Sequence, residues 1–178
     1  MHVIDTKFKD LKIIQQKKHG DSRGSLRETF IKEIIKWHEL VFDYATVSKK
    51  NVLRGFHFQT RFQQVKYVTV LKGKILDYVI DLRRKSKTFG KSFSIILSGN
   101  NCKSLYIPKG FGHAYYSFSK VNVIYYKLSN YYHPECEDGI LWNDRNLRCK
   151  WPAKNPIVSS KDKKLKTFID FKTLYKGL

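Results

Sequence analysis

A histidine that could act as a base lies in residues 51–59, which read Asn-Val-Leu-Arg-Gly-Phe-His-Phe-Gln. Histidine is the side chain that exchanges a proton most readily near neutral pH, and a neighbouring glycine leaves room for a ligand to approach. Strand alternation places His57 and Gln59 on one face and Arg54 on the other, unless Gly55 forms a bulge. Two interpretations are open here: a general base, or a buried histidine whose hydrogen bonds are satisfied.

Three further parts of the sequence carry groups that could join such a base. One is a lysine at the start of an apolar strand, followed after a turn by an aspartate. Another is the loop Ile-Pro-Lys-Gly-Phe-Gly, which delivers a second histidine to a strand, and the third is a tyrosine-rich run. Each also has an ordinary structural explanation, since strand lysines are usually solvated and tyrosines favour half-buried strands. If the strands form a barrel, these groups could converge on one concave face: Lys66, Asp77, His113, Tyr126 and Tyr132.

The elements that must position these groups are short strands. From residue 44 onward the apolar residues alternate with a period of two, and glycine, asparagine and proline separate the alternating runs. Seven or eight short strands at this spacing indicate an antiparallel sandwich or small barrel of the jelly-roll kind. The expected strands are 44–48, 51–59, 65–71, 74–82, 92–98, 103–107, 113–118 and 122–128.

Other segments depart from this pattern of strands. Phe30, Ile34 and Trp37 have helical spacing and predict a short amphipathic helix over about 29–39. We also expect a strand at 11–14, a turn at 19–24 and a terminal helix at about 163–175. Because the sequence has no internal repeat and no linker, residues 1–178 are interpreted as one mainly β domain with a few short helices.

The composition narrows the class of protein. Apolar residues make up 42% of the 178 residues, which predicts a packed globule. No stretch of 18 apolar residues is present and the N-terminal sequence does not resemble a signal peptide, so we expect no membrane span and a cytoplasmic location. Three widely spaced cysteines are expected to be reduced thiols: Cys102, Cys136 and Cys149.

The formal net charge of +20 would favour an anionic partner such as nucleic acid, an acidic membrane or a phosphorylated small molecule. The lysines are scattered, however, and no recognition helix, zinc finger or RNP-like motif accompanies them. Nucleic-acid binding is therefore kept only as a rival interpretation, and no nucleic-acid partner is expected.

Six short blocks occur in the order typical of one family. They are GDSRG at 20–24, NVLRGFHFQ at 51–59, DLRRKS at 81–86, IPKGFGH at 107–113, YKLSNYYHP at 126–134 and GILWND at 139–144. This order resembles the dTDP-4-dehydrorhamnose 3,5-epimerase family, and the resemblance extends from about residue 10 to residue 165. The family members are cupin-type jelly-roll enzymes that act on nucleotide-linked 4-keto-6-deoxy sugars.

The resemblance implies a set of catalytic roles. In the family a histidine removes the proton beside the C4 ketone, and His57 matches it. Asp162 matches the aspartate that orients this histidine, and Lys66 the cation that stabilises the negative charge on the C4 oxygen. Tyr126 matches the acid that returns a proton from the opposite face. The resemblance thus implies an epimerase that inverts C3, C5 or both, and that uses no cofactor.

The resemblance to the family also implies which residues bind the substrate. Arg54 and Arg23 match diphosphate contacts, and Glu28 and Tyr132 match positions near the nucleotide. The remaining expected binding residues are Gln59, Asp77 and His113. Arg23 and Glu28 would reach the site of a neighbouring subunit, which implies a homodimer. No metal is expected, because His-Phe-Gln stands where metal-binding cupins have a His-x-His ligand pair.

The sequence departs from the family pattern at two places. Phe42-Asp43-Tyr44-Ala45-Thr46 stands where Gln-x-Asn-x-Ser is usual, and Ser25-Leu26 follows the Arg-Gly turn in place of aromatic residues. Because these positions serve nucleotide and sugar recognition, alternatives stay open. They are a GDP-4-keto-heptose 3- or 3,5-epimerase, a 3,4-ketoisomerase on the same fold, and a non-catalytic cupin that binds sugar nucleotides.

Overall fold

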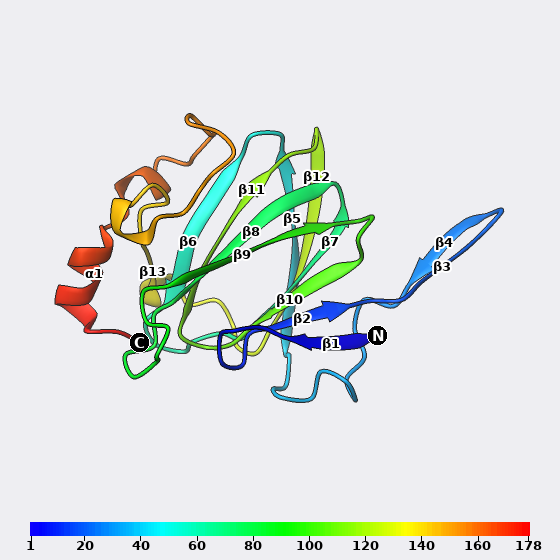
Figure 1. The fold of residues 1–178 in the computed structure, drawn as a ribbon, viewed down its shortest axis with the longest axis horizontal. Coiled ribbons are helices and arrows are strands. Elements are labelled where there is room, and N and C mark those ends of the chain that lie inside the picture. Colours follow the sequence, from blue (N-terminus) through cyan, green and yellow to red (C-terminus); the bar gives the residue numbers. More distant parts are fainter.

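Two antiparallel β-sheets pack face to face in the computed structural model, which describes residues 1–178 (Figure 1). The six-stranded sheet has the order β1-β2-β10-β7-β12-β5, and the five-stranded sheet has the order β13-β6-β11-β8-β9. The strands are β1 (His2–Asp5), β2 (Lys12–Gln15), β5 (Phe42–Lys49), β6 (Leu53–Gln59), β7 (Lys66–Lys72), β8 (Lys74–Asp81), β9 (Ser92–Ser98), β10 (Lys103–Ile107), β11 (Phe111–Ser117), β12 (Val121–Leu128) and β13 (Glu137–Gly139). This arrangement confirms the expected jelly-roll sandwich of the cupin type.

The alternation of side chains along the strands creates the core between the sheets. On β12, every second residue is buried, and Ile124 and Leu128 join Val68, Val70 and Leu105 in a cluster of 14 buried residues. The period of two in the sequence therefore reports a real division between inner and outer faces. Burial of this apolar surface is the main term that holds the two sheets together.

The bulge at Gly55 that the sequence left open is present in β6. His113 on β11 lies opposite His57, yet Tyr115 lies opposite Arg54, so β6 has one more residue than β11 between the two pairs. Gly55 occupies the bulge with a φ of +103°. Because of the extra residue, Arg54 and His57 can point to the same side of the sheet although they are three positions apart. Arg54 donates a hydrogen bond to Ser48 on β5, and His57 lines the pocket between the sheets.

The outer face of the five-stranded sheet is covered by the C-terminal part of the chain. Phe56 and Phe58 pack against Trp151, Phe168 and Phe171 in a second buried cluster. The covering segment contains the 3-10 turns η1 (Pro134–Cys136), η2 (Arg145–Leu147) and η3 (Asp162–Lys164) and the helix α1 (Phe168–Tyr175). A capping box between Thr167 and Asp170 starts α1, which explains why the helix begins at Phe168 instead of the predicted 163.

A two-stranded arm extends away from the body of the molecule (Figure 1). It consists of β3 (Lys18–Asp21) and β4 (Gly24–Arg27), paired antiparallel in the region predicted only as a turn. Leu26 is its one large apolar residue and is exposed, so the arm lacks the apolar alternation that reveals a strand buried on one side.

The helix predicted at 29–39 is wrong. Residues 28–40 form turns that lie over the outer face of the six-stranded sheet, where Phe30 and Ile35 pack with Tyr67 and Tyr106. One helical turn closes between the Ile35 amide and the Ile31 carbonyl, at 3.0 Å, but the helix does not propagate. Short helices are marginal without strong propensity, and β-branched isoleucines lower it further.

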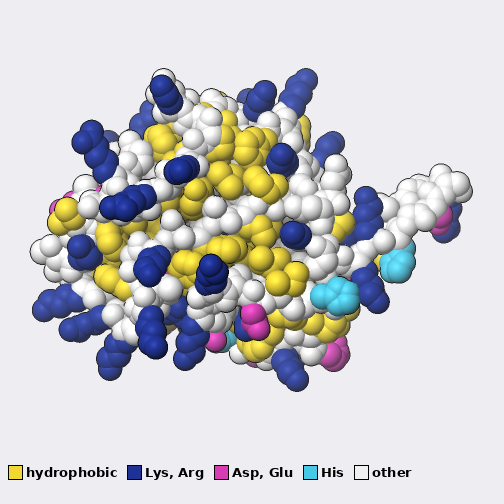
Figure 2. All heavy atoms as spheres, viewed as in Figure 1, with side chains coloured by type: hydrophobic (Ala, Val, Ile, Leu, Met, Phe, Trp, Pro, Cys, Tyr) yellow, Lys and Arg dark blue, Asp and Glu magenta, His cyan; other side chains and the backbone are white.

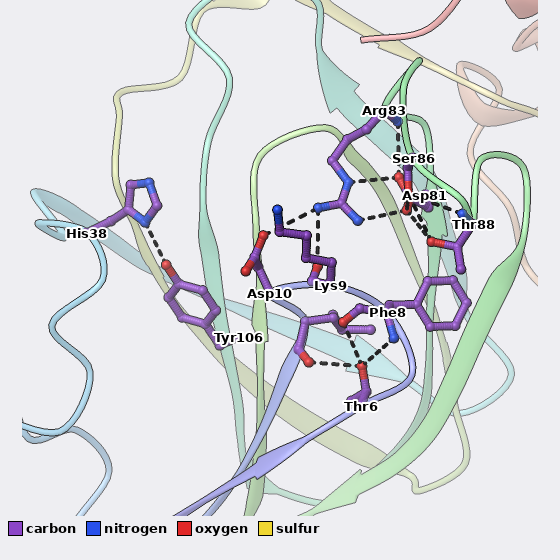
Figure 3. A network of polar contacts seen from close by, with 11 residues as sticks. Thr6, Phe8, Lys9, Asp10, His38, Asp81, Arg83, Ser86, Thr88 and Tyr106 are labelled. Carbon is purple, nitrogen blue, oxygen red and sulfur yellow. Dashed lines mark hydrogen bonds and ion pairs between the residues drawn. The ribbon is translucent and has the colours of Figure 1, made fainter.

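The block DLRRKS forms a tight structural network (Figure 3). Asp81 is fully buried and accepts hydrogen bonds from the Arg83 guanidinium and from the hydroxyls of Ser86 and Thr88, at 2.6 to 2.9 Å. Arg83 also donates to the carbonyl of Lys9. This block therefore fixes the loop after β8.

Basic side chains are spread over the face shown in Figure 2, and a group of them from the N-terminal segment and the loop after β8 lines one hollow: Lys7, Lys9, Arg83, Arg84, Lys85 and Lys87. Figure 2 shows Lys and Arg side chains distributed around the visible face, with hydrophobic side chains between them. All three cysteines are free, as expected. No helix of the structure has both the length and the apolar character needed to cross a membrane.

The bulge makes Gly55 sensitive to substitution. A Cβ atom at this position would lie 2.3 Å from the His113 carbonyl oxygen and 2.8 Å from the Ala114 Cα, in addition to the positive φ. We predict that Gly55→Ala lowers the free energy of unfolding by about 2 kcal/mol or more. Gly20→Ala is the matched control, because its Cβ would meet only the Gly24 carbonyl oxygen at 3.5 Å. Denaturant titration of both variants checks this, and equal losses would contradict it.

Candidate active site

A pocket of about 300 Å³ opens between the two sheets. β5 and β7 contribute from the six-stranded sheet, and β6 and β13 from the five-stranded sheet. Its lining combines predicted site residues with residues that the sequence did not single out: Phe42, Tyr44, His57, Phe58, Gln59, Gln64, Lys66, Tyr132 and Glu137. The pocket thus brings His57 and Lys66, the predicted base and cation, into one cavity.

His57 is paired with Asp162, as the sequence predicted. The His57 Nε2 lies 2.8 Å from Asp162 Oδ1, and the other carboxylate oxygen accepts the Gly55 amide at 3.0 Å. The His57 side chain is 27% exposed to the pocket, whereas the Asp162 side chain is only 4% exposed. The bulge residue therefore serves the site directly, since its amide helps to hold the carboxylate.

The pair defines which nitrogen of His57 can act as a base. Burial pushes the pKa of Asp162 upward, but the hydrogen bond and charge of His57 outweigh burial and hold that pKa below its ordinary value. An ionised carboxylate can only accept, so the Nε2 of His57 must donate. The lone pair of the neutral ring then lies on Nδ1. This nitrogen is free to take a proton from a bound molecule.

Lys66 is the cation of the pocket. It begins β7, and burial lowers the pKa of its ammonium to about 8, while Glu137 and Asp77 act in the opposite direction. A partly desolvated ammonium interacts strongly with negative charge that develops nearby, because little water screens it. Lys66 is therefore suited to stabilise an oxyanion beside His57.

Tyr126 lies behind the pocket rather than on its surface. It is only 3% exposed and stacks on Tyr44, with ring centroids 4.8 Å apart and planes inclined by 22°. Burial is the largest cause that raises the pKa of Tyr126 well above its ordinary value, and the neighbouring Tyr115 adds to it. The phenol therefore keeps its proton. Tyr44, which does line the pocket, has its pKa raised to about 12 by burial.

A second histidine–aspartate pair lies deeper in the sandwich. The His113 Nε2 is 2.8 Å from Asp77 Oδ2, and both residues are buried. The His113 ring meets Tyr126 edge to face, with centroids 6.1 Å apart. Burial raises the pKa of Asp77, opposed by His113 and Lys66. The pair therefore contacts Tyr126 through the His113 ring and interacts with Lys66 through the charge of Asp77, and it does not itself line the pocket.

The described chain contains no group of three or more His, Cys, Asp or Glu side chains that could hold a metal ion. What it does assemble is a base with its orienting carboxylate, a desolvated cation and a protonated phenol. Such a set can remove a proton next to a carbonyl group, stabilise the resulting enolate and return a proton.

Comparison with known proteins agrees with this chemistry. Residues 5–170 match the family model of dTDP-4-dehydrorhamnose 3,5-epimerase. The chain belongs to this family.

Individual relatives cover almost the whole chain. The dTDP-4-dehydrorhamnose 3,5-epimerase of Shigella flexneri is 37% identical over 96% of this chain and 97% of its own length. The dTDP-6-deoxy-D-glucose-3,5-epimerase of Legionella pneumophila, solved with dTDP-4-keto-L-rhamnose, is 39% identical over 93% of this chain and 92% of its own, with a TM-score of 0.89. A 3'-monoepimerase from Streptomyces bikiniensis, solved with dTDP-quinovose, is 26% identical over 98% of this chain and 90% of its own, with a TM-score of 0.90. This chain of the epimerase family is accordingly an isomerase of nucleotide-linked sugars.

The other predicted binding residues of this epimerase have varied surroundings. Gln59 lines the pocket, but its amide donates to the Phe62 carbonyl at 2.7 Å and accepts the His133 amide at 2.8 Å, so it also fixes the pocket rim. Arg54 donates to Ser48 at 3.2 Å and is exposed. The hydroxyl of Tyr132 donates to Glu137 at 2.9 Å.

Arg23 and Glu28 do not reach the pocket of their own chain. Arg23 lies at the tip of the arm, where its side chain is 88% exposed and paired with Asp21. Glu28 lies at the base of the arm, where its amide donates to the Lys17 carbonyl. The single chain therefore separates these two residues from the other predicted binding residues.

Glu137 is the charged pocket residue that sequence reasoning missed, along with Phe58 and Gln64. It is tied to Lys161 and Tyr132, and these bonds lower its pKa although burial acts to raise it. Its strand has three residues, too few for any period to show in the sequence. Only the pairing of β13 with β6, which places Gly139 opposite His57, brings Glu137 to the pocket.

The lowered pKa of Lys66 sets an expected pH dependence of the epimerase. Because Lys66 loses its charge above a pKa of about 8, we predict that kcat/KM falls as the pH rises through this value. Lys66→Arg keeps a charge at higher pH and should move this basic limb upward, whereas Lys66→Met should lower kcat by about 10² to 10³. Lys49→Arg, at an exposed strand end, is the control and should leave the profile unchanged. A basic limb shared by the wild type and Lys66→Arg would contradict the assignment.

Proposed function

We propose that this enzyme inverts C3 and C5 of a dTDP-linked 4-keto-6-deoxy hexose by proton abstraction and reprotonation. The observation that carries the proposal is the His57–Asp162 pair: His57 lines a pocket that is also lined by Lys66. The ketone at C4 acidifies the protons on both neighbouring carbons, so one base can serve each in turn.

In the proposed reaction, one proton is removed from each carbon and another is returned to its opposite face. Nδ1 of His57 takes the proton from C3 or C5, and the electron pair of the broken C–H bond shifts to form an enolate with its charge on the C4 oxygen. The Lys66 ammonium stabilises this oxygen. Tyr126, which lies behind Tyr44, then donates its phenolic proton to the carbon from the opposite face. The electron pair of the enolate C=C bond forms the new C–H bond, the C4 ketone re-forms, and the negative charge passes to the Tyr126 phenolate. Solvent exchange restores the proton of Tyr126 and removes that of His57.

The dTDP nucleotide and the two centres of inversion are supported by the relatives at 37% and 39% identity, which are 3,5-epimerases. Inversion at C3 alone is the second candidate, favoured by the likeness to a 3'-monoepimerase. Phe42 and Tyr44, which stand where polar residues are usual, bring two aromatic rings to the lining of the pocket that contains His57. Less room for the sugar to turn would restrict the base to one carbon.

We also propose that the enzyme acts as a homodimer. Three apolar side chains are exposed on the adjacent strands β5, β12 and β7: Val47 at 65%, Val121 at 41% and Leu71 at 44%. Contact with a second copy would remove them from water. The arm extends beyond the body, so in a dimer it could bring Arg23 and Glu28 to the partner's pocket (Figure 1). An arginine fork suits the oxygens of a diphosphate.

The proposed reaction predicts exchange of substrate protons with solvent. In D₂O, NMR should show loss of the C3 and C5 proton signals of dTDP-4-keto-6-deoxyglucose, and a GDP-linked 4-keto sugar serves as the comparison. His57→Asn should reduce exchange at both carbons by about 10³ or more, because no base remains. His38→Asn, outside the pocket, is the matched control. Exchange at C3 alone would support a monoepimerase. A product with the carbonyl group moved to another carbon would support a ketoisomerase, and binding of the sugar nucleotide without exchange would support a non-catalytic protein.

The stacked tyrosines allow a matched test of the acid. Tyr126→Phe should reduce inversion more than it reduces exchange, because abstraction at His57 survives without the donor on the opposite face. Tyr44→Phe keeps the stacking partner and should leave the ratio of inversion to exchange close to that of the wild type. Product and deuterium content are measured together by NMR. An equal loss of exchange and inversion in Tyr126→Phe would exclude the proposed role.

A further inference from the structure

Two adjacent acidic residues on β13 are paired with two lysines that flank Asp162 in sequence. Glu137 forms an ion pair with Lys161, and Asp138 forms one with Lys166. The carboxylates are largely buried, with side chains 16% and 15% exposed. The short segment that carries Asp162 is therefore attached to β13 on both sides.

Each carboxylate has a second donor. The hydroxyl of Tyr132 donates to Glu137 at 2.9 Å, and the hydroxyl of Tyr175 donates to Asp138 at 2.5 Å. Burial acts to raise the pKa of Asp138, but the hydrogen bonds from Lys166 and Tyr175 lower it overall, so it stays ionised. Strand alternation separates the two groups: Glu137 lines the pocket, whereas Asp138 faces Tyr175 of α1.

The strand that holds this segment also holds the base. β13 pairs with β6 so that Gly139 lies opposite His57, and Ile140 forms a bridge with Lys166. Asp162 itself lies in the short turn η3, whose local hydrogen bonds join the Asp162 amide to the Ser159 hydroxyl and the Lys163 amide to the Ser159 carbonyl. Such a turn has few bonds of its own to fix the carboxylate in place.

We infer that the Glu137–Lys161 and Asp138–Lys166 pairs form a clamp that positions Asp162 against His57. These four residues are positioning residues, because they act on the reaction through Asp162. The clamp matters for catalysis only where His57 is the base, so the inference rests on the proposed function. An orienting carboxylate shifted by a fraction of an ångström no longer holds the ring in register for proton transfer.

The Asp138 side of the clamp separates positioning from substrate contact. Asp138 and Lys166 do not line the pocket, so their loss should change kcat and leave KM near the wild-type value. We expect Asp138→Asn to lower kcat about tenfold. Lys166→Met should have a similar effect, and Lys166→Arg should restore most of the rate because it keeps the charge.

A double-mutant cycle tests whether the effect passes through Asp162. In an Asp162→Asn background, Asp138→Asn should cause no further loss, because the group that the clamp positions is already removed. Asp5→Asn, which breaks the exposed Asp5–Lys12 pair, is the matched control and should leave kcat unchanged. Equal losses from Asp138→Asn in both backgrounds, or no loss in either, would overturn the clamp.

A readout without turnover keeps the clamp distinct from the proposed reaction. In ¹⁵N-labelled protein, the Nε2–H signal of His57 reports its hydrogen bond to Asp162. We expect this signal to broaden or shift in Asp138→Asn and to persist in Asp5→Asn, whether or not any sugar is converted. An unchanged signal in Asp138→Asn overturns the clamp even where the epimerase reaction is established. Tyr175→Phe, which removes one hydrogen bond to Asp138, serves if Asp138→Asn does not fold.

Discussion

The hydrogen bond between His57 and Asp162 is the interaction on which the site depends, and it joins residues 105 positions apart in the chain. For the carboxylate to reach the ring, β6 must bulge at Gly55, whose amide supplies a further hydrogen bond to the same carboxylate. The C-terminal segment must also return across the outer face of the five-stranded sheet. The packing of Phe56 and Phe58 against that segment therefore serves the chemistry as well as the stability of the fold.

Burial assigns the charge states around this pair. The same desolvation that lowers the pKa of Lys66 to about 8 raises the pKa of Tyr126 well above its ordinary value. A low dielectric disfavours whichever form is charged, so a base and an acid respond in opposite directions. The result is a lysine that is still a cation at neutral pH and a tyrosine that keeps its proton. The pKa of Asp162 is lowered in spite of burial, because His57 and the Gly55 amide stabilise its charged form.

The sequence predicted the parts of the fold that depend on local alternation. Alternation shows most clearly in β12, whereas β11 is buried along its whole length and is bounded in the sequence by its flanking turn residues. The bulge at Gly55 that the sequence left open is present. The helix at 29–39 failed because its apolar residues pack onto the sheet as turns. Glu137 could not be found, since nothing within a strand of three residues reveals which neighbour it will pair with. When a site residue is placed by the pairing of strands that are distant in sequence, no local pattern of apolar and polar residues reveals it.

The charges of the pocket bear on how a diphosphate could be recognised. Lys66 is the only lysine or arginine that lines the pocket, and its proposed partner is the C4 oxygen. Lys161 lies near the pocket but is already paired with Glu137. The two phosphates of a nucleotide sugar then require cations from outside the pocket lining. Arg54 is a candidate, since it is exposed and donates only to the Ser48 hydroxyl. Arg23 lies on an arm that extends from the body of the molecule, and its ion pair with Asp21 is exposed to water, where such pairs contribute little. In the proposed homodimer, this weakly held arginine would exchange Asp21 for a phosphate bound to the neighbouring copy, so the proposal links substrate binding to dimer formation.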